Sequence, residues 1–492
     1  MKQNSFMEGG SYGTRIADLY IVHNLAAVCG DSRHTYHAMP PVGWMNDPNG
    51  FNEAFGKFHL FYQFYPFGAA WDSMHWGHYT TQDFVKWKLE PTALAPDEQF
   101  DLGGCFSGSS IVKDGKMYLM YTSVSTDKQT QSIAVSEDGI HFVKLGEVIS
   151  GSQLPKGCVK TDFRDPKVFK RGEFYYLLAG SMSEESEGMI LLYRSPDLMN
   201  WEYVSTLRKD KRTTRGIYEC PDLMEIDGTD VMIASPQGYE TNDWRYENEQ
   251  SSIYMLGKLD VEKGVFEKVY EDELDGGFDF YAPQTLRASD GRAIMIAWMQ
   301  MWHRSFPTQK HGWAGSMTLP RELTLKEGRL YQCPVREIER YRWNPVRFTG
   351  VKIGNNTTLT KVSGTKIELL FTLDMGTANK VGIKLYQNDE HDARIYYDRD
   401  LDRVIFDRSR MGIEIAHDAK EKDASVRSVK VDVKDNMLSM RIFLDVLSCE
   451  VFLQNGERVM TGNVYSEGDG ISFFAEGDGA KILNLEKYDI VV

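Results

Sequence analysis

Several features that would place a chain of this size in a membrane, on nucleic acid or around a metal are missing. No run approaches the roughly 18 apolar residues that a membrane-spanning helix needs. Acidic residues outnumber basic ones by 71 to 56, and the formal charge of −15 comes with no Lys/Arg-rich run, which argues against nucleic acid and an anionic membrane as partners. The six cysteines include no Cys-x-x-Cys pair, so a metal-binding or redox motif is not expected.

The N-terminal segment, residues 1–35, has one apolar stretch at residues 16–28. Asp18, His23 and Asn24 interrupt this stretch, so it is better interpreted as part of a short amphipathic helix than as the core of a secretion signal. A cytoplasmic location is then the default. At 492 residues the whole chain is too long for one typical core, and two domains or one large repeat architecture are expected.

A turn with a central glycine recurs five times, each time before a segment rich in aromatic and branched apolar residues. The glycines are Gly56, Gly115, Gly172, Gly228 and Gly291, so the steps between them are 59, 57, 56 and 63 residues. A near-constant period of this size, with room for several short strands, is typical of a β-propeller. Five copies predict five blades.

A second repeated element supports the propeller. Turns at Asp83, Asp138 and Asp197 each carry an aromatic residue four positions later and follow the glycine turns at similar intervals, as outer hairpins of successive blades would. We therefore expect an all-β chain with a five-bladed propeller over residues 36–340. Beyond it, strand-like segments at 366–374, 394–398, 426–433 and 440–453 predict a C-terminal β-sandwich over residues 350–492.

Three acids occupy nearly the same phase of the repeat. Asp47, Asp165 and Glu219 precede the glycine of their own turn by nine, seven and nine residues. Because the first strands of propeller blades line one channel, these carboxylates should converge on the axis. Folding alone gives no reason to collect mutually repelling carboxylates, whereas a glycosidase needs one ionised and one protonated carboxyl beside the scissile bond.

Calcium binding is the alternative use of such an oxygen cluster, since this hard cation prefers oxygen ligands. Arg164 beside Asp165 already supplies a counter-charge. We therefore expect neither a metal nor a cofactor.

Three multi-residue motifs carry a resemblance to a known family. Trp-Met-Asn-Asp-Pro-Asn-Gly stands at 44–50, Arg-Asp-Pro at 164–166 and Glu-Cys-Pro at 219–221. From about residue 37 to 340, and weakly into the C-terminal region, the chain resembles glycoside hydrolase family 32, the β-fructofuranosidases. That family has a five-bladed propeller followed by a β-sandwich. The resemblance implies an invertase-type enzyme that hydrolyses terminal β-D-fructofuranosidic bonds in sucrose, sucrose-6-phosphate or short fructans, with retention through a covalent fructosyl-enzyme.

The resemblance also implies the residue roles. Asp47 would attack the anomeric C2, Glu219 would protonate the leaving oxygen and then activate water, and Asp165 would hold fructose hydroxyls and stabilise the transition state. Retention requires the Asp47 and Glu219 carboxyls to lie about 5–5.5 Å apart. The residues expected to bind the sugar are Asn46, Gln63, Trp71, Phe106, Ser107, Arg164, Tyr281 and Trp298.

The sequence leaves other functions open. A fructosyltransferase would use the same site with a sugar in place of water, and an inverting arabinan or xylan hydrolase would hold its carboxyls about 6.5–9.5 Å apart. A carbohydrate-binding propeller without catalysis would need no convergent acids. A phosphorylated substrate would need basic residues at the rim, for which the loop candidates are Arg33, Lys211, Arg212, Arg215, Arg245, His303 and Arg304.

The expected partner is a small sugar such as sucrose. The sandwich has no sequence feature that decides between stabilising the propeller, binding glycans and pairing two copies as a homodimer.

Overall fold

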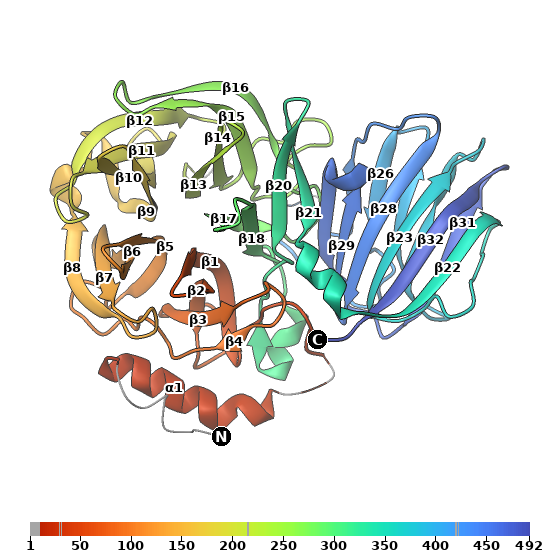
Figure 1. The fold of residues 1–492 in the computed structure, drawn as a ribbon, viewed down its shortest axis with the longest axis horizontal. Helices are drawn as coiled ribbons and strands as arrows, with labels where there is room; N and C mark the ends of the chain where they lie inside the picture. Colours follow the sequence, from red (N-terminus) through yellow and green to blue (C-terminus); the bar gives the residue numbers. More distant parts are fainter. Residues whose placement is uncertain (1–9, 29, 31, 214–215, 419–420, 422) are drawn as a thin grey trace.

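The protein is built almost entirely from β-strands, which form a ring of sheets and a separate pair of sheets (Figure 1). A computed structural model describes residues 10–492 except 29, 31, 214–215, 419–420 and 422. No helix in this described part of the chain has the length and apolar character that crossing a membrane requires.

The ring consists of five sheets between residues 43 and 334. The first holds β1 Gly43–Ala54, β2 Lys57–Tyr65, β3 His75–Thr81 and β4 Lys88–Leu89, and the second holds β5 Gly104–Lys113, β6 Lys116–Val124, β7 Gln129–Ser136 and β8 Val143–Ile149. The third holds β9 Cys158–Arg171, β10 Phe174–Ser183, β11 Gly188–Ser195 and β12 Glu202–Asp210, and the fourth β13 Tyr218–Ile226, β14 Thr229–Pro236, β15 Ile253–Asp260 and β16 Val265–Glu273. The fifth holds β17 Tyr281–Arg287, β18 Ala293–Trp298, β20 Arg321–Lys326 and β21 Arg329–Pro334.

The ring closes through the first strand of each sheet. β1, β5, β9, β13 and β17 contact one another in this order, and β17 contacts β1 (Figure 1). A short strand, β19 Trp313–Ala314, also pairs in parallel with β1, with Gly43 opposite Trp313 and Trp44 opposite Ala314. The predicted all-β fold with a propeller and a sandwich is confirmed, and the predicted count of five blades is a proposal that these five sheets support.

Local turn chemistry explains the strand order within each sheet. The second strand of every sheet follows one of the repeated glycine turns; at Asp114-Gly115 both residues have positive φ, 50° and 74°, as the tightest hairpins require. The predicted outer turns also form. Asp138 Oδ1 accepts the backbone N–H groups of Ile140 at 2.8 Å and His141 at 2.9 Å between β7 and β8.

The C-terminal part is a two-layer sandwich. One sheet has the order β22-β32-β23-β28-β29-β30 and the other β27-β26-β25-β24-β31. The strands are β22 Arg342–Lys352, β23 Lys366–Asp374, β24 Lys380–Gln387, β25 Ala393–Asp398, β26 Arg403–Asp407, β27 Val426–Val429, β28 Met437–Asp445, β29 Ser448–Leu453, β30 Arg458–Asn463, β31 Gly470–Glu476 and β32 Lys481–Ile490. Inward-facing side chains such as Leu369, Ile383 and Leu444 are completely buried between the layers.

The two parts meet at a short 3-10 helix, η4 Arg336–Tyr341. β21 before it belongs to the last sheet of the ring, and β22 after it belongs to the sandwich. The expected start of the sandwich at residue 350 falls inside β22. We propose η4 as the boundary.

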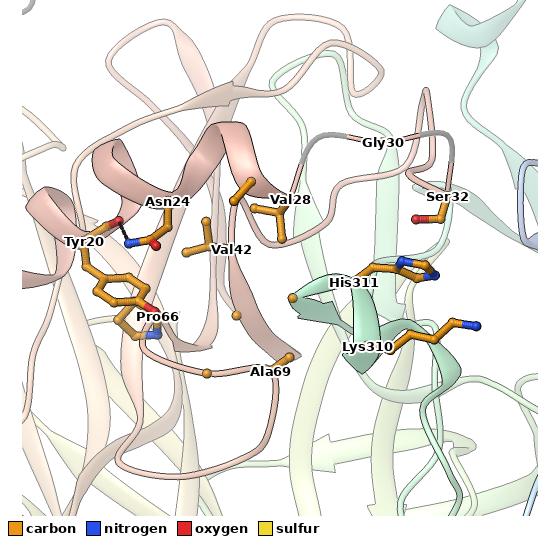
Figure 2. Close-up of a pocket in the computed structure, with 14 residues that line it drawn as sticks. Tyr20, Asn24, Val28, Gly30, Ser32, Val42, Pro66, Ala69, Lys310 and His311 are labelled. Atoms are coloured by element: carbon orange, nitrogen blue, oxygen red, sulfur yellow. Dashed lines mark hydrogen bonds between the residues drawn. The ribbon is translucent and has the colours of Figure 1, made fainter.

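The N-terminal segment contains α1 Tyr12–Asn24 and η1 Leu25–Ala27, which overlap the predicted helix. α1 lies outside the ring beside the first sheet, and its Asp18 carboxylate accepts the Thr92 backbone N–H at 2.9 Å. A cavity of about 450 Å³ lies between α1, the loop around Pro66 and the 3-10 helix that contains Lys310 (Figure 2). It shares no lining residue with the carboxylate cavity described below. The remaining 3-10 helices are η2 Gly151–Gln153, η3 Pro307–His311 and η5 Gln454–Gly456.

Candidate active site

The three predicted carboxylates lie in one cavity. Asp47 of β1, Asp165 of β9 and Glu219 of β13 all line a space of about 450 Å³. They come from the first strands of the first, third and fourth sheets, which face one another in the closed ring. The convergence that the repeat phase predicts is therefore present.

An irregularity in each first strand turns these side chains toward the cavity. The pairing register shifts between Met45 and Pro48 in β1, and comparable shifts occur in β5, β9, β13 and β17. Where a proline is present, it has no N–H to donate to the neighbouring strand. The strand therefore bulges, and the adjacent side chain points in a new direction. Asp165, Cys220 and Ala282 have positive φ values of 64°, 44° and 51° at these bulges, so ring geometry holds them in an unfavourable backbone conformation.

Asp47 is held from both sides. Ser107 Oγ donates to Asp47 Oδ2 at 2.6 Å, and Asn46 Nδ2 donates to Oδ1 at 3.0 Å. Trp44 Nε1 in turn donates to Asn46 Oδ1 at 2.7 Å, which fixes the amide orientation. Burial raises the pKa of Asp47, the Ser107 hydrogen bond opposes that rise, and the nearby Glu219 charge adds to it.

Asp165 shares its surroundings with Asp47 through Cys220. The Cys220 backbone N–H donates to Asp165 Oδ2 at 3.0 Å, and its thiol lies 3.7 Å from the same oxygen and 3.6 Å from Asp47 Oδ2. Burial raises the pKa of Asp165 to about 7; the Arg164 charge lowers it, and Glu219 and Asp47 raise it. Burial and the two neighbouring carboxylates therefore raise the pKa of Asp165 against the opposing charge of Arg164.

Glu219 is oriented by an arginine and a tyrosine. Arg164 donates to Glu219 Oε1 from Nε at 3.0 Å and from Nη2 at 2.9 Å, while the Tyr281 hydroxyl donates to Oε2 at 2.6 Å. Arg164 Nη1 also binds Asp162 Oδ1 at 3.1 Å. The carboxyl group is therefore fixed in plane and direction, as proton transfer to a bound substrate requires.

The structure brings most of the predicted sugar-binding residues to this cavity. The lining includes Asn46, Gln63, Trp71, Phe106, Ser107 and Arg164. Tyr281 is not part of the lining but contacts Glu219. Trp298 is completely buried and packs behind the site against Trp44 and Trp302, with ring centroids 6.0 and 4.9 Å away. The expectation of a sugar contact at Trp298 has no support in this geometry, because core packing occupies the indole.

Sequence patterns missed part of the lining. The additional residues are Gln129, Thr161, Asp162, Gln237, Gln250 and Trp302, with His303 proposed from sequence only as a phosphate contact. Gln237 and Gln250 form an isolated bridge across a long loop between β14 and β15. Trp302 lies in the loop after β18, and its aromatic ring is the signal in the sequence that could have marked it as a sugar-stacking residue.

The basic residues considered for phosphate binding are mostly engaged elsewhere. Arg33 donates to Pro40 O, Arg212 pairs with Glu271, and Arg245 pairs with Asp272. Arg304 is buried in a polar cluster, Lys211 is exposed outside the lining, and Arg215 lies outside the described residues. Of these candidates, His303 is the one that the described cavity contains.

Two groups of potential metal ligands lie away from the three carboxylates. Glu249, His303 and Asp418 place one ligand atom each within 4.8 Å of one another at the rim, and His34, His37 and Asp445 do so where the residues before β1 meet the end of β28. In the second group both His37 ring nitrogens already contact carboxylates. Neither group includes Asp47, Asp165 or Glu219, whose hydrogen bonds to protein groups account for their orientation.

Comparisons with known proteins identify the family of the chain. The profile for the N-terminal domain of glycosyl hydrolases family 32 matches residues 37–334, and that for the family's C-terminal domain matches residues 337–489. The chain is 35% identical over 470 residues to a Bacillus subtilis sucrose-6-phosphate hydrolase, covering 92% of this chain and 93% of that one. It is 36% identical over 453 residues to an Escherichia coli raffinose invertase, covering 88% and 90%.

A solved structure is similar along almost the whole chain. A Bombyx mori family 32 β-fructofuranosidase superposes with a TM-score of 0.84 at 35% identity, covering 97% of this chain and 98% of that one. The family motifs in the sequence, the two domain matches and this common fold agree. The chain therefore belongs to glycosyl hydrolase family 32 and is a glycoside hydrolase.

Proposed function

We propose that this protein is a retaining β-fructofuranosidase of the invertase type, which releases fructose from a small fructoside. The observation that carries the proposal is the meeting of Asp47, Asp165 and Glu219 in one cavity, each from a different sheet. Relatives named sucrose-6-phosphate hydrolase and raffinose invertase, and a Bombyx mori family member solved in complex with sucrose, support a sucrose-like substrate.

Asp47 is the proposed nucleophile. Its carboxylate attacks the anomeric C2, and the C2–O bond to the leaving group breaks as the covalent fructosyl-enzyme forms. The Ser107 and Asn46 hydrogen bonds orient the carboxylate and favour its ionised form, offsetting part of the cost of burial. Water then attacks C2, and Asp47 leaves as a carboxylate.

Glu219 is the proposed acid and base. It gives its proton to the departing oxygen and takes one back from the attacking water, so the two half-reactions balance. Each carboxyl oxygen has two lone pairs, so the contacts with Arg164 and Tyr281 leave room for the transferred proton. Asp165, anchored by the Cys220 N–H, is placed to accept hydrogen bonds from fructose hydroxyls.

The charges around the cavity favour an unphosphorylated fructoside. Four described lining residues are acidic, namely Asp47, Asp162, Asp165 and Glu219, whereas Arg164 is the one described arginine or lysine and already pairs with Glu219 and Asp162. A phosphate dianion entering this space would meet a net negative field. We therefore propose sucrose as a better substrate than sucrose-6-phosphate.

Steady-state kinetics on sucrose, sucrose-6-phosphate and inulin test both parts of the proposal. We expect turnover of sucrose with a higher kcat/KM than for its phosphate, and at least ~10³-fold lower kcat for Asp47→Asn and Glu219→Gln. Initial products in aqueous methanol should be fructose and methyl β-fructofuranoside. An α-fructoside, or full activity of Asp47→Asn, would remove the retaining assignment.

A cytoplasmic location, a homodimer through the sandwich and the ratio of hydrolysis to fructosyl transfer stay predictions. The product ratio at high sucrose measures the last of these directly.

A further inference from the structure

One buried guanidinium lies directly behind the rim of the carboxylate cavity. Arg304 follows His303, which lines the cavity, yet its own side chain is only 1% exposed. Within the propeller it donates to Phe278 O at 2.7 Å, to Asp279 Oδ1 at 3.1 Å and to Asn248 Oδ1 at 2.9 Å. Nη1 and Nη2 of the guanidinium are therefore both used in contacts that hold the loop around His303 to the propeller.

The sandwich supplies the main counter-charge to this arginine. Arg304 donates to both Glu421 carboxyl oxygens, from Nε to Oε2 at 2.9 Å and from Nη2 to Oε1. Glu421 is 2% exposed and also accepts from Arg427 Nη2, while Arg427 Nε reaches back to Asn248 Oδ1 at 2.9 Å. Arg304 and Glu421 thus form a buried ion pair with two hydrogen bonds, which connects the propeller to the sandwich.

Backbone pairing joins the same two segments. Ser305 N–H donates to Ala416 O at 2.7 Å, the Ala416 N–H donates to Ser305 Oγ at 3.1 Å, and the Asp418 N–H donates to His303 O at 3.0 Å. An antiparallel bridge between Arg304 and His417 lies between these contacts. The loop that carries His303 is therefore held as an added strand segment against the sandwich.

Three segments that meet at Arg304 each lead within two residues to a residue that lines the cavity or contacts Glu219. Asn248 precedes Gln250, which lines the cavity, and Asp279 precedes Tyr281, which binds Glu219. Arg304 itself follows Trp302 and His303. A change at Arg304 or its partner would thus reach these cavity residues through very short stretches of backbone.

Trp302 and His303 belong to the open end of the cavity. Asn46, Gln63 and Ser107 at the closed end are at most 3% exposed, whereas Trp302 is partly exposed and His303 exposed. On the proposed function, a terminal fructosyl unit occupies the closed end beside Asp47, so the leaving sugar extends toward the open end. Hence the loop held by the sandwich borders the leaving sugar and not the fructosyl unit.

We propose that Arg304 and Glu421 are positioning residues through which the sandwich sets the leaving-sugar half of the active site. Stability alone does not account for the pair, because a buried ion pair contributes little net stability compared with apolar residues of similar volume. The arrangement does account for why the sandwich, none of whose described residues lines the cavity, is hydrogen-bonded to the loop of Trp302 and His303.

Kinetics on sucrose with fructose as a competing ligand test this proposal, which rests on the proposed function. In Glu421→Gln and Arg304→Lys, we expect KM for sucrose to rise about tenfold, while kcat falls much less and the inhibition constant of fructose stays unchanged. Fructose is the informative probe because it occupies the closed end alone. Ser305→Ala leaves the buried charges intact and should raise KM about threefold.

Arg329→Ala is the matched control, since Arg329 pairs with Glu457 across the same two domains at 3.4 Å but lies outside the cavity. This variant should leave KM for sucrose and the inhibition constant of fructose unchanged. The proposal is overturned if Ser305→Ala and any folded variant of Arg304 or Glu421 lower only the melting temperature or the active fraction and leave KM for sucrose constant. It is also overturned if KM for sucrose and the inhibition constant of fructose rise together. Absence of sucrose turnover in the unmodified enzyme would instead count against the proposed function.

Discussion

The Tyr281 hydroxyl donates a 2.6 Å hydrogen bond to Glu219 Oε2, joining the first strands of two neighbouring sheets at the cavity. Tyr281 is buried and its hydroxyl oxygen also lies 3.0 Å from Ser235 O, so packing limits the movement of the ring. The hydroxyl is therefore a rigid support for the proposed acid and base, although Tyr281 itself does not line the cavity.

Removing this hydroxyl should slow the chemical steps. In Tyr281→Phe, Glu219 keeps its Arg164 contacts but loses the restraint on Oε2, so we expect kcat for sucrose to fall about tenfold with little change in KM. Tyr121→Phe is the matched control, because Tyr121 is equally buried and donates to Asp101 at 2.9 Å away from the site. Equal losses of kcat in both variants would show a general packing effect instead.

The acidic limb of the pH profile should depend on Ser107. Its hydroxyl stabilises the ionised form of Asp47, whose pKa is already raised by burial. Ser107→Ala removes a stabilising contact from the charged form, so the pKa of Asp47 rises further and the acidic limb of kcat/KM should move up by about one pH unit. An acidic limb at the same pH in variant and parent would contradict Asp47 as the group that must be ionised.

The preference between sucrose and sucrose-6-phosphate should depend on the charge of Asp162. This carboxylate lines the cavity, is about a quarter exposed and pairs with Arg164 at 3.1 Å. Asp162→Asn removes one negative charge, so kcat/KM for sucrose-6-phosphate should improve about fivefold relative to that for sucrose at low ionic strength. Glu137→Gln, on an exposed outer turn, is the charge-matched control and should not alter the ratio. A ratio that responds equally to both variants would indicate a long-range effect of net charge.

Alkaline pH should weaken the junction between the N-terminal segment and the sandwich. His37 donates to Asp445 at 2.8 Å and to Glu450 at 2.9 Å, and all three side chains are fully buried. Burial alone lowers the pKa of His37, but the two carboxylate hydrogen bonds outweigh it and raise the pKa to about 9. The protonated ring therefore contributes stability that is complete below the unfolded-state pKa near 6.5 and is lost as pH rises to about 9.

That shift corresponds to about 3 kcal/mol in the free energy of unfolding, which denaturant titrations at about pH 6 and pH 9 would measure. His37→Gln should be less stable than the parent at the lower pH and should lack this part of the alkaline loss. The idea fails if both proteins lose the same stability between the two pH values.

Local chemistry explains what was predictable. Glycine turns such as Asp114-Gly115 and side-chain-capped turns such as that at Asp138 depend on a few adjacent residues, so their repetition predicts the sheets and the phase of the carboxylates. The first strands follow from the same period. The convergence of Asp47, Asp165 and Glu219 is then a consequence of ring closure.

The parts of the site that the sequence did not predict depend on contacts between distant segments. Trp302 and His303 line the cavity on a loop whose next residue, Arg304, pairs with Glu421 more than a hundred residues later, and no local pattern marks that pair. Residue type alone does not reveal which side of a strand faces the core, so the sequence predicts a sugar contact at Trp298, which is buried. The left-handed conformation of Cys220 is likewise imposed by the bulge and is not a preference of cysteine.

The parallel pairing of β19 with β1 has a consequence for biosynthesis. Trp44, three residues before the proposed nucleophile Asp47, pairs with Tyr65 of β2 but acquires its second partner strand only when Trp313 and Ala314 have left the ribosome. Nascent chains that stop earlier carry every catalytic motif yet lack β20 and β21, which complete the fifth sheet, and such long-range pairing forms slowly. Catalytic competence should therefore arise in a single late step of translation, and a truncated polypeptide would be an aggregation hazard for the cell rather than a partly active enzyme.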